Sequence, residues 1–258
     1  KLGDLFAFKQ DHIFKDWDDV KANANNRYDA IGELYGPAAW EALKDKAGKQ
    51  PIEPGDVCWA DLNNDGVINN LDRVKVGNLF PTVTGGFSTT LGYKDFSLYA
   101  RFDYALGHTL YNDLAARSLG QYQGSFNIID MVKDSWSETN QNTDIPKFYY
   151  ADQLSKKNIT RSNNGLTAVD NNSSRFYEKG DYLALREITL TWNLPKKWIN
   201  KALMSNASVY VTGQNLFYIT GYTGVSPEPA VDTTYGQGLD NGRYPTPKTV
   251  LLGLSVTF

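Results

Sequence analysis

The sequence is poor in the residues that form disulfides and metal centres. Its 258 residues include one cysteine, Cys58, and two histidines, His12 and His108. A single cysteine excludes an internal disulfide, and we expect no cysteine-based metal site. The histidines do not stand in an HExxH pattern, and no nucleophile arrangement typical of hydrolases is recognisable. We therefore do not expect an enzyme.

Long hydrophobic runs and an excess of positive charge are absent too. No run approaches the roughly 18 apolar residues of a membrane-spanning helix, which excludes helical spans only. A barrel strand alternates apolar and polar residues, so it keeps average hydropathy low. A formal net charge of −3 and no basic run argue against a nucleic-acid partner. The chain begins at Lys1 without an initiator methionine or signal-peptide features, as a mature secreted protein or a fragment would.

Aromatic residues and period-two patterns are what the sequence has in excess. It holds 16 Tyr, 12 Phe and 6 Trp, which suit barrel girdles and carbohydrate-binding surfaces equally. In the closing strand one face is wholly apolar, with Val250, Leu252, Leu254, Val256 and Phe258. The other face carries Leu251, Gly253, Ser255 and Thr257. This strand fits either the core of a soluble β-sandwich or the lipid face of a transmembrane barrel.

Four further strands are predicted by the same alternation. They cover residues 82–93, Phe96–Leu106, Tyr182–Leu194 and Ser208–Tyr218. A phase break at Arg186–Glu187 predicts a β-bulge. Arg101 and Asp103 fall on the non-apolar face of the second strand, which implies water or a polar lumen there. In the fourth strand Tyr210, Leu216 and Tyr218 share one parity and Val209, Val211 and Phe217 the other, which leaves inside and outside ambiguous.

The connections alternate between long and short. Loops 108–181 and 221–247 are long and polar, whereas a tight turn at Gly92–Asp95 and a segment at 195–206 with one helical turn are short. Such alternation favours an outer-membrane barrel over a soluble sandwich. Short helices are predicted at Asp16–Ala24, Gly36–Ala47 and Phe126–Trp136.

A twelve-residue segment, 61–72, fits the pattern of a calcium-binding loop. The candidate ligands are Asp61, Asn63, Asp65, the carbonyl of Val67, Asn69 (through water) and Asp72. Gly66 permits the sharp turn, and Ile68 is expected to pack inward. The alternative is an Asx-rich turn without metal. Asp72 stands where calcium loops often have glutamate, and the shorter aspartate leaves the affinity open. The expected role of a bound Ca²⁺ is structural, fixing an outer loop.

Five stretches also carry a family resemblance. They are 55–78, Trp136–Lys147, Arg175–Pro195 ("RFYEKGDYLALREITLTWNLP"), Gly213–Glu228 ("GQNLFYITGYTGVSPE") and Tyr244–Phe258 ("YPTPKTVLLGLSVTF"). In this order they resemble the C-terminal part of the SusC-like TonB-dependent transporters of Bacteroidetes outer membranes. Residues 1–54 match only loosely.

The resemblance implies the C-terminal strands of an all-β transmembrane barrel of roughly twenty-two strands. Residues 1–82 would be an extracellular loop region containing the calcium-loop motif 61–72, and residues 83–258 the last five antiparallel strands with outer loops 108–181 and 221–247. The family imports glycans or peptides through the outer membrane, with energy from TonB and a SusD-like lipoprotein as lid. TonB would act through an N-terminal region that this sequence lacks.

The resemblance also implies an orientation and a dependence on lipid. The C-terminus would be periplasmic, loops 108–181 and 221–247 extracellular, and the strands would contact outer-membrane lipid. Five strands alone cannot close a barrel, so we expect the chain to be stable only beside the rest of one. The alternative function is a soluble, calcium-stabilised carbohydrate-binding β-domain.

Overall fold

The structure, a computed structural model, divides the chain into two compact units. It describes residues 2–23, 53–65, 68, 70–121, 130–148, 173–228, 238–242 and 244–258. Unit 1 comprises residues 1–79, 110–178 and 230–242, and unit 2 comprises residues 80–109, 179–229 and 243–258. Among the described helices, none has the length and apolar character needed to cross a membrane.

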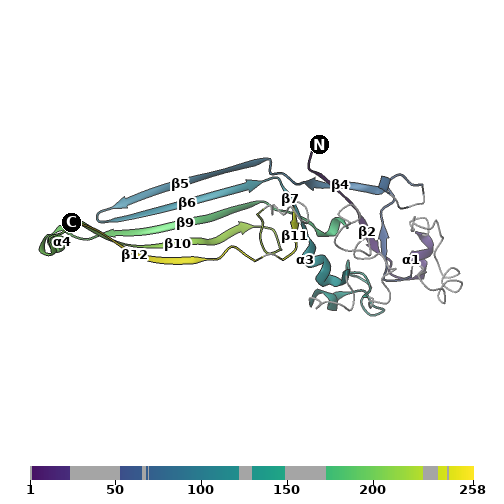
Figure 1. Cartoon of the computed structure of the whole chain (residues 1–258). Coiled ribbons are helices and arrows are strands. Elements are labelled where there is room, and N and C mark those ends of the chain that lie inside the picture. The colour runs from purple at the N-terminus through teal and green to yellow at the C-terminus, as the bar shows by residue number, and fades with distance from the viewer. Residues whose placement is uncertain are drawn as a thin grey trace. The chain divides into compact units, whose positions relative to one another are not determined.

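Unit 2 is built on one antiparallel sheet of five long strands (Figure 1). The strands are β5 (Val83–Tyr93), β6 (Phe96–Leu106), β9 (Tyr182–Asn193), β10 (Asn206–Thr220) and β12 (Thr249–Thr257). Their order across the sheet is β12–β10–β9–β6–β5. Because each of these strands pairs with the next long strand along the chain, this is an up-and-down meander, and the five predicted strands are confirmed.

The register of the sheet aligns apolar side chains on one face across all five strands. Phe102 pairs with Phe87 on one side and with Leu185 on the other, and Val211 pairs with Leu190 and Leu252. Much of this face is exposed rather than buried in a core, with Leu252 80% and Phe258 87% accessible. A closing strand of a soluble sandwich would bury these positions, so the exposed face contradicts the sandwich interpretation.

Two bulges keep the apolar face continuous. In β9 the register skips Arg186, as the phase break predicts, and in β10 it is interrupted between Gln214 and Phe217. Asn215 adopts φ 52° within this second bulge. The bulge resolves the ambiguous strand, because it places Phe217 with Leu185 on the apolar face.

One side chain departs from the predicted alternation at this second bulge. Leu216, expected to share a face with Tyr210, instead lies against Gly213, which pairs with Ile188 on the apolar face. Asn215 and Leu216 both stand outside the pairing of β10 with β9. Because two residues are left out, the strand keeps its parity beyond the bulge, and the change of face is confined to a residue within the bulge.

On the polar face, Gly253 leaves room for an aromatic ring from the neighbouring strand. Tyr210 is the cross-strand partner of Gly253, and a Cβ at this glycine would overlap the Tyr210 ring. At Gly92, on the same face, a Cβ would meet no atom within 4 Å. The ring of Tyr210 therefore covers backbone that a side chain would otherwise cover.

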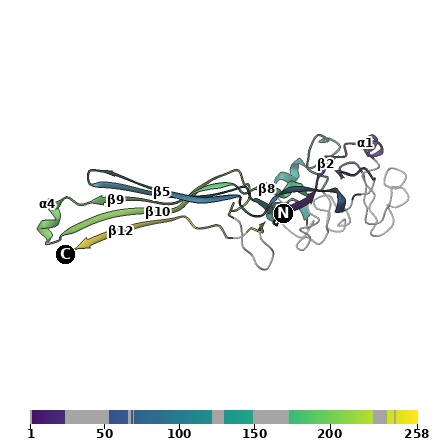
Figure 2. The ribbon, with the colours of Figure 1, turned by 90° about the horizontal axis from the view of Figure 1, so that it is seen from above.

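The short connections lie together at one end of the sheet. The β5–β6 turn contains Lys94 with φ 53°, and β9 is joined to β10 through α4 (Lys196–Ile199) and η7 (Asn200–Ala202). Figures 1 and 2 show this turn, α4 and the C-terminus at the same end of the strands. The predicted tight turn and helical turn are both confirmed.

Unit 1 consists of short strands and helical turns. They are β1 (Asp4–Phe8), β2 (Gln10–Ile13), α1 (Trp17–Ala22), β3 (Val57–Trp59), η1 (Asn70–Asp72), β4 (Arg73–Asn78), β7 (Thr109–Asn112), α3 (Asp113–Ala116), η2 (Arg117–Gln121), η3 (Asp130–Asp134), η6 (Ser174–Phe176), β8 (Tyr177–Lys179) and β11 (Leu239–Asp240). They form the pairs β1–β4 and β2–β3 and the small sheet β11–β7–β8. Among the described residues, three separate apolar clusters hold these elements, one of them around Tyr111, Phe176 and Leu239.

The predicted helices have mixed outcomes. Helix α1 confirms the one predicted at Asp16–Ala24, and the Asp16 side chain caps it by accepting from the Asp19 amide. Of the segment Phe126–Trp136, residues 130–136 are described, and Asp130–Asp134 form the 3₁₀ helix η3. The helix predicted at Gly36–Ala47 lies outside the described residues.

Candidate functional site

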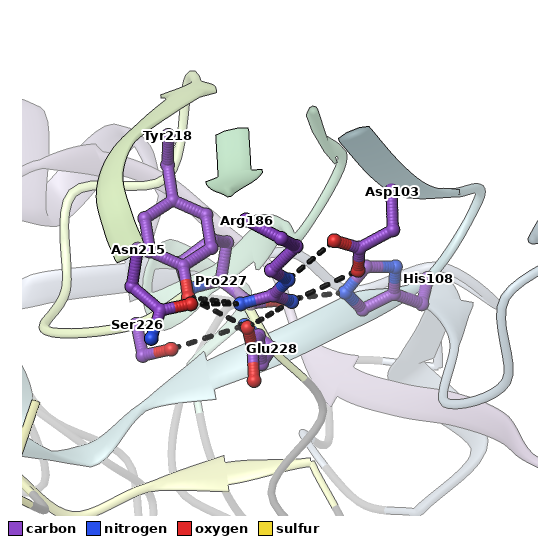
Figure 3. A network of polar contacts seen from close by, with 8 residues as sticks. All are labelled: Asp103, His108, Arg186, Asn215, Tyr218, Ser226, Pro227 and Glu228. Atoms are coloured by element: carbon purple, nitrogen blue, oxygen red, sulfur yellow. Dashed lines mark hydrogen bonds and ion pairs between the residues drawn. The ribbon is translucent and has the colours of Figure 1, made fainter. Parts of the chain in front are cut away.

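The bulge in β9 directs Arg186 into a network of polar side chains on the polar face of unit 2 (Figure 3). Its guanidinium makes a two-point contact with the carboxylate of Asp103 on β6, and one of these hydrogen bonds is 2.9 Å long. The same guanidinium lies 2.5 Å from the Glu228 carboxylate. Fork-shaped pairing of this kind fixes orientation as well as charge.

Two tyrosines and an asparagine complete the surroundings of Arg186. The Tyr218 hydroxyl accepts from Arg186 at 3.0 Å and donates to Glu228 at 2.6 Å. The guanidinium also lies 5.5 Å from the ring centre of Tyr218 and 6.0 Å from that of Tyr182, within reach of cation–π attraction. Asn215, from the bulge in β10, lies 3.5 Å away. Each bulge of the sheet thus contributes one member of the network.

The network fixes the segment after β10 to the strands. Glu228 belongs to this segment, and its neighbour Pro227 accepts a 2.9 Å hydrogen bond from the imidazole of His108. A carbonyl oxygen can only accept, so the Nε2 atom of His108 carries the proton. His108 is buried (1% accessible), and a side chain at Gly180 would overlap its ring. The segment 221–228 is therefore anchored at two consecutive residues.

An open pocket lies beside the network. Its volume is about 560 Å³, and it is lined by Gly86, Phe87, Ser88, Arg101, Phe102, Asp103 and Arg186. Arg101 is exposed, whereas Arg186 is only 18% accessible. Arg101 and Asp103, both predicted from the alternation to lie on the non-apolar face, line this pocket.

The calcium-loop motif lies in unit 1, apart from the network in sequence. Of its predicted ligands, Val67 and Asn69 lie outside the described residues, while Asp61, Asn63, Asp65 and Asp72 are described. Asp72 is fully buried, and its carboxylate accepts a 2.9 Å hydrogen bond from the Leu62 amide. Asn63 and Asp65 bind each other through two hydrogen bonds of 2.8 and 3.1 Å.

The loop also packs as expected. Ile68 is fully buried in a cluster with Phe8, Trp59 and Trp136, which confirms its predicted inward position. The contact between Asp72 and Leu62 joins the last position of the motif to its second. The residues present therefore suit an oxygen-lined cation site in chemical type.

The chain is similar in sequence to several proteins that are named TonB-dependent receptors. The chain is 32% identical over 243 residues to TonB-dependent receptor P3 of Formosa agariphila, a match that covers 89% of this chain and 22% of that protein. It is 26% identical over 221 residues to SusC of Bacteroides thetaiotaomicron, covering 85% of this chain and 19% of that protein. No family model matches the chain. The chain thus spans about a fifth of the length of these relatives.

Solved structures agree on the fold. The RagAB peptide transporter superposes with a TM-score of 0.59 at 23% identity, covering 79% of this chain and 21% of that one. A closed state of the RagAB peptide importer covers 98% of this chain and 23% of that one, with a TM-score of 0.56 at 20% identity. The chain belongs to the SusC-like TonB-dependent transporters, and the resemblance is confirmed. The fold is that of the C-terminal strands of a large barrel.

Two of the stretches that resemble SusC-like transporters contain residues of the network around Arg186. "RFYEKGDYLALREITLTWNLP" contains Arg186, and "GQNLFYITGYTGVSPE" contains Asn215, Tyr218 and Glu228. Sequence reasoning identified both stretches but did not join them, because no periodicity links an arginine in a bulge to a glutamate in a loop. The phase break at Arg186 was the available signal, since bulges often redirect a side chain.

Proposed function

We propose that the chain forms part of a TonB-dependent outer-membrane importer of glycans or peptides that works with a SusD-like lipoprotein lid. The observation that carries the proposal is the two-faced sheet of unit 2. One face exposes large apolar side chains, and the other carries the network around Arg186. A wall between lipid and an aqueous lumen needs these two faces. The proposed role is transport without a chemical step.

The proposed placement in the membrane follows the arrangement of the connections. The β5–β6 turn, the α4 connection and the C-terminus share one end of the sheet (Figure 2), which we assign to the periplasm. Loops 108–181 and 221–247 would then be extracellular. The lengths of the strands, 9 to 15 residues, suit a tilted barrel strand.

The partner and the cargo can be tested in one experiment. The full-length protein that contains this chain is purified from native outer membranes with an affinity tag, and co-purifying proteins and bound small molecules are identified by mass spectrometry. We expect a lipoprotein in the complex together with oligosaccharides or peptides. RagAB is described as a peptide importer, which makes peptides one cargo class to look for.

A transport assay separates binding from import. Uptake of the identified cargo by intact cells should disappear when the gene is deleted and when an uncoupler removes the proton-motive force. Uptake that is unaffected by either treatment would overturn the proposal. Recovery of the protein in the aqueous fraction, without detergent, would overturn the membrane placement.

We also propose that the loop 61–72 binds a structural Ca²⁺. The support is the set of oxygen-bearing side chains at the first, third, fifth and twelfth positions and the closed contact between Asp72 and Leu62. Asp61, Asn63, Asp65 and Asp72 would hold the ion with Val67 and Asn69. Bound there, the ion would supply no chemistry beyond fixing the loop.

Titration calorimetry on the full-length protein tests this site. Asp65→Ala should remove the heat of calcium binding, because it removes one of the ligating carboxylates. Asp18→Asn, which changes an exposed carboxylate on α1, is the matched control and should leave the heat unchanged. Equal heats of calcium binding in the parent protein and in Asp65→Ala would contradict the proposed site.

A further inference from the structure

The chain places its single cysteine opposite one of its two histidines. β2 pairs with β3 in antiparallel register, and His12 is the partner of Cys58. Directly paired residues project their side chains to the same face of a ladder. The register shifts between Gln10 and His12, so Asp11 occupies a bulge beside this pair. Two scarce, metal-binding residue types and a carboxylate therefore meet at one point of unit 1.

The three side chains bring their donor atoms close together. A carboxylate oxygen of Asp11, a ring nitrogen of His12 and the Cys58 sulfur all lie within 4.8 Å of one another. Bond lengths of about 2.0–2.3 Å place the ligands of tetrahedral zinc roughly 3.3–3.8 Å apart. Small side-chain rotations would thus close the group around an ion.

The exposure to solvent increases from Cys58 through His12 to Asp11. Cys58 is fully buried, the side chain of His12 is 31% accessible and that of Asp11 is 54% accessible. An ion can therefore approach from the Asp11 side and reach the sulfur inside. Such an entry path is one requirement of a real metal site.

A second carboxylate orients the histidine. Asp11 contacts Nδ1 of His12 at 2.9 Å, and Asp19 contacts Nε2 at 3.2 Å. Asp19 is itself held by the Lys15 amide at 2.9 Å and the Asn23 side-chain amide at 2.8 Å. If Nδ1 binds a metal, Nε2–H donates to Asp19, which is the arrangement that fixes the ring of many metal-bound histidines.

We propose that Asp11, His12 and Cys58 form a binding site for Zn²⁺, with Asp19 positioning His12. Thiolate, imidazole and carboxylate together suit zinc, whereas calcium and magnesium take oxygen ligands only. Binding releases the thiol proton of Cys58 to solvent, and the imidazole stays neutral. Three protein ligands leave a fourth position for water. The ion would tie β2 to β3 near the start of α1.

Without an ion, the same residues have an ordinary structural role. Cys58 packs with Phe14 and Val20 in a small apolar cluster, and His12 lies edge-on to Phe14 with ring centres 5.4 Å apart. In that case His12 is a partly exposed histidine between two carboxylates. The experiment must therefore detect the sulfur–metal bond itself.

Cobalt(II) is the probe, because a thiolate bound to cobalt gives an intense charge-transfer absorption in the near ultraviolet. The full-length protein is reduced, freed of metal and titrated with Co²⁺, and Zn²⁺ is then added. We expect one equivalent of cobalt to produce the absorption and zinc to abolish it. Cys58→Ser should lose the absorption, and His12→Gln should weaken binding at least tenfold. Asp19→Asn should weaken it roughly 10–100-fold, as loss of an outer carboxylate does.

Asp18→Asn is the control, because it removes an exposed carboxylate of α1, the helix that carries Asp19, and Asp18 is not one of the proposed site residues. It should leave the titration unchanged. A reduced protein that gives no charge-transfer absorption with cobalt would overturn the proposal. An absorption that is equally intense in Cys58→Ser would overturn it too.

Discussion

The two units of the chain differ in where their apolar side chains go. Unit 2 has five strands of 9 to 15 residues and leaves many large apolar side chains exposed on one face. Unit 1 has strands of two to six residues, and its described residues include three small buried apolar clusters. Unit 1 therefore carries its own cores, whereas the sheet of unit 2 leaves its apolar face uncovered, as the proposed contact with lipid requires.

The largest difference in stability between variants is expected from substitutions on the two faces of β12. Leu252 lies on the apolar face and Leu251 on the polar face. We expect Leu252→Arg to destabilise the full-length barrel by roughly 2–4 kcal/mol, because an arginine would enter lipid. Leu251→Arg should cost less than about 1 kcal/mol, since a polar lumen solvates the charge. Unfolding by guanidinium in phospholipid vesicles measures both, and equal losses would contradict the assignment of the faces.

The network around Arg186 gives the next largest effect. Arg186→Leu leaves Asp103 and Glu228 without their cation, and we expect a loss of roughly 1–3 kcal/mol, limited by the partial exposure of both acids. Arg186→Lys keeps the charge but loses the two-point contact, so it should recover only part of the stability. Unfolding in the same vesicles measures both variants, and full recovery by lysine would show that charge alone matters.

The anchoring of the segment 221–228 is a second property of this network that can be measured. If Arg186 holds the segment 221–228 through Glu228, limited proteolysis of Arg186→Leu should cut that segment faster than in the parent protein. Asp103→Asn, which leaves Glu228 in place, should speed the cutting less. Unchanged proteolysis in Arg186→Leu would show that the segment is held by other contacts.

Packing on the polar face predicts a smaller effect. Gly253→Ala would push the Tyr210 ring from its place, at a cost of roughly 1–2 kcal/mol. Gly92→Ala, on the same face but with open space, should change stability by less than about 0.5 kcal/mol. The same vesicle unfolding assay applies. A neutral Gly253→Ala would mean that Tyr210 moves freely.

The same contrast explains how much the sequence could predict. In unit 2, alternation over about ten residues specifies which face is apolar, so all five strands and the bulge at Arg186 could be predicted. The face of Leu216 was predicted wrongly, because it lies within the bulge of β10, where the strand does not alternate, and the alternation on either side gives no sign of this bulge. The ion pair of Arg186 with Glu228 joins a strand to a distant loop, and no local pattern encodes it.

In unit 1 the strands are too short for periodicity to identify. β3 has three residues and β11 has two, and each exists because a distant segment pairs with it. The capped helix α1 could be predicted because Asp16 signals its start locally. The meeting of His12 with Cys58 could not, since it depends on the β2–β3 register.

The smallest expected effect is a local pH dependence in unit 1. Hydrogen bonds from Lys75, at 2.8 Å, and Asn78, at 2.9 Å, hold the pKa of Asp4 below its ordinary value near 3.8. A lowered folded pKa means that Asp4 stabilises the β1–β4 pair above that ordinary value and that this stabilisation is lost as pH falls through the folded pKa. Asp4→Asn should therefore speed hydrogen exchange of the β1 and β4 amides at neutral pH. The difference from the parent protein should shrink once the pH falls below about 4, the ordinary carboxyl range. Lys75→Met should reproduce the same pH profile, and a difference that persists unchanged in acid would show that packing, not charge, holds this strand pair.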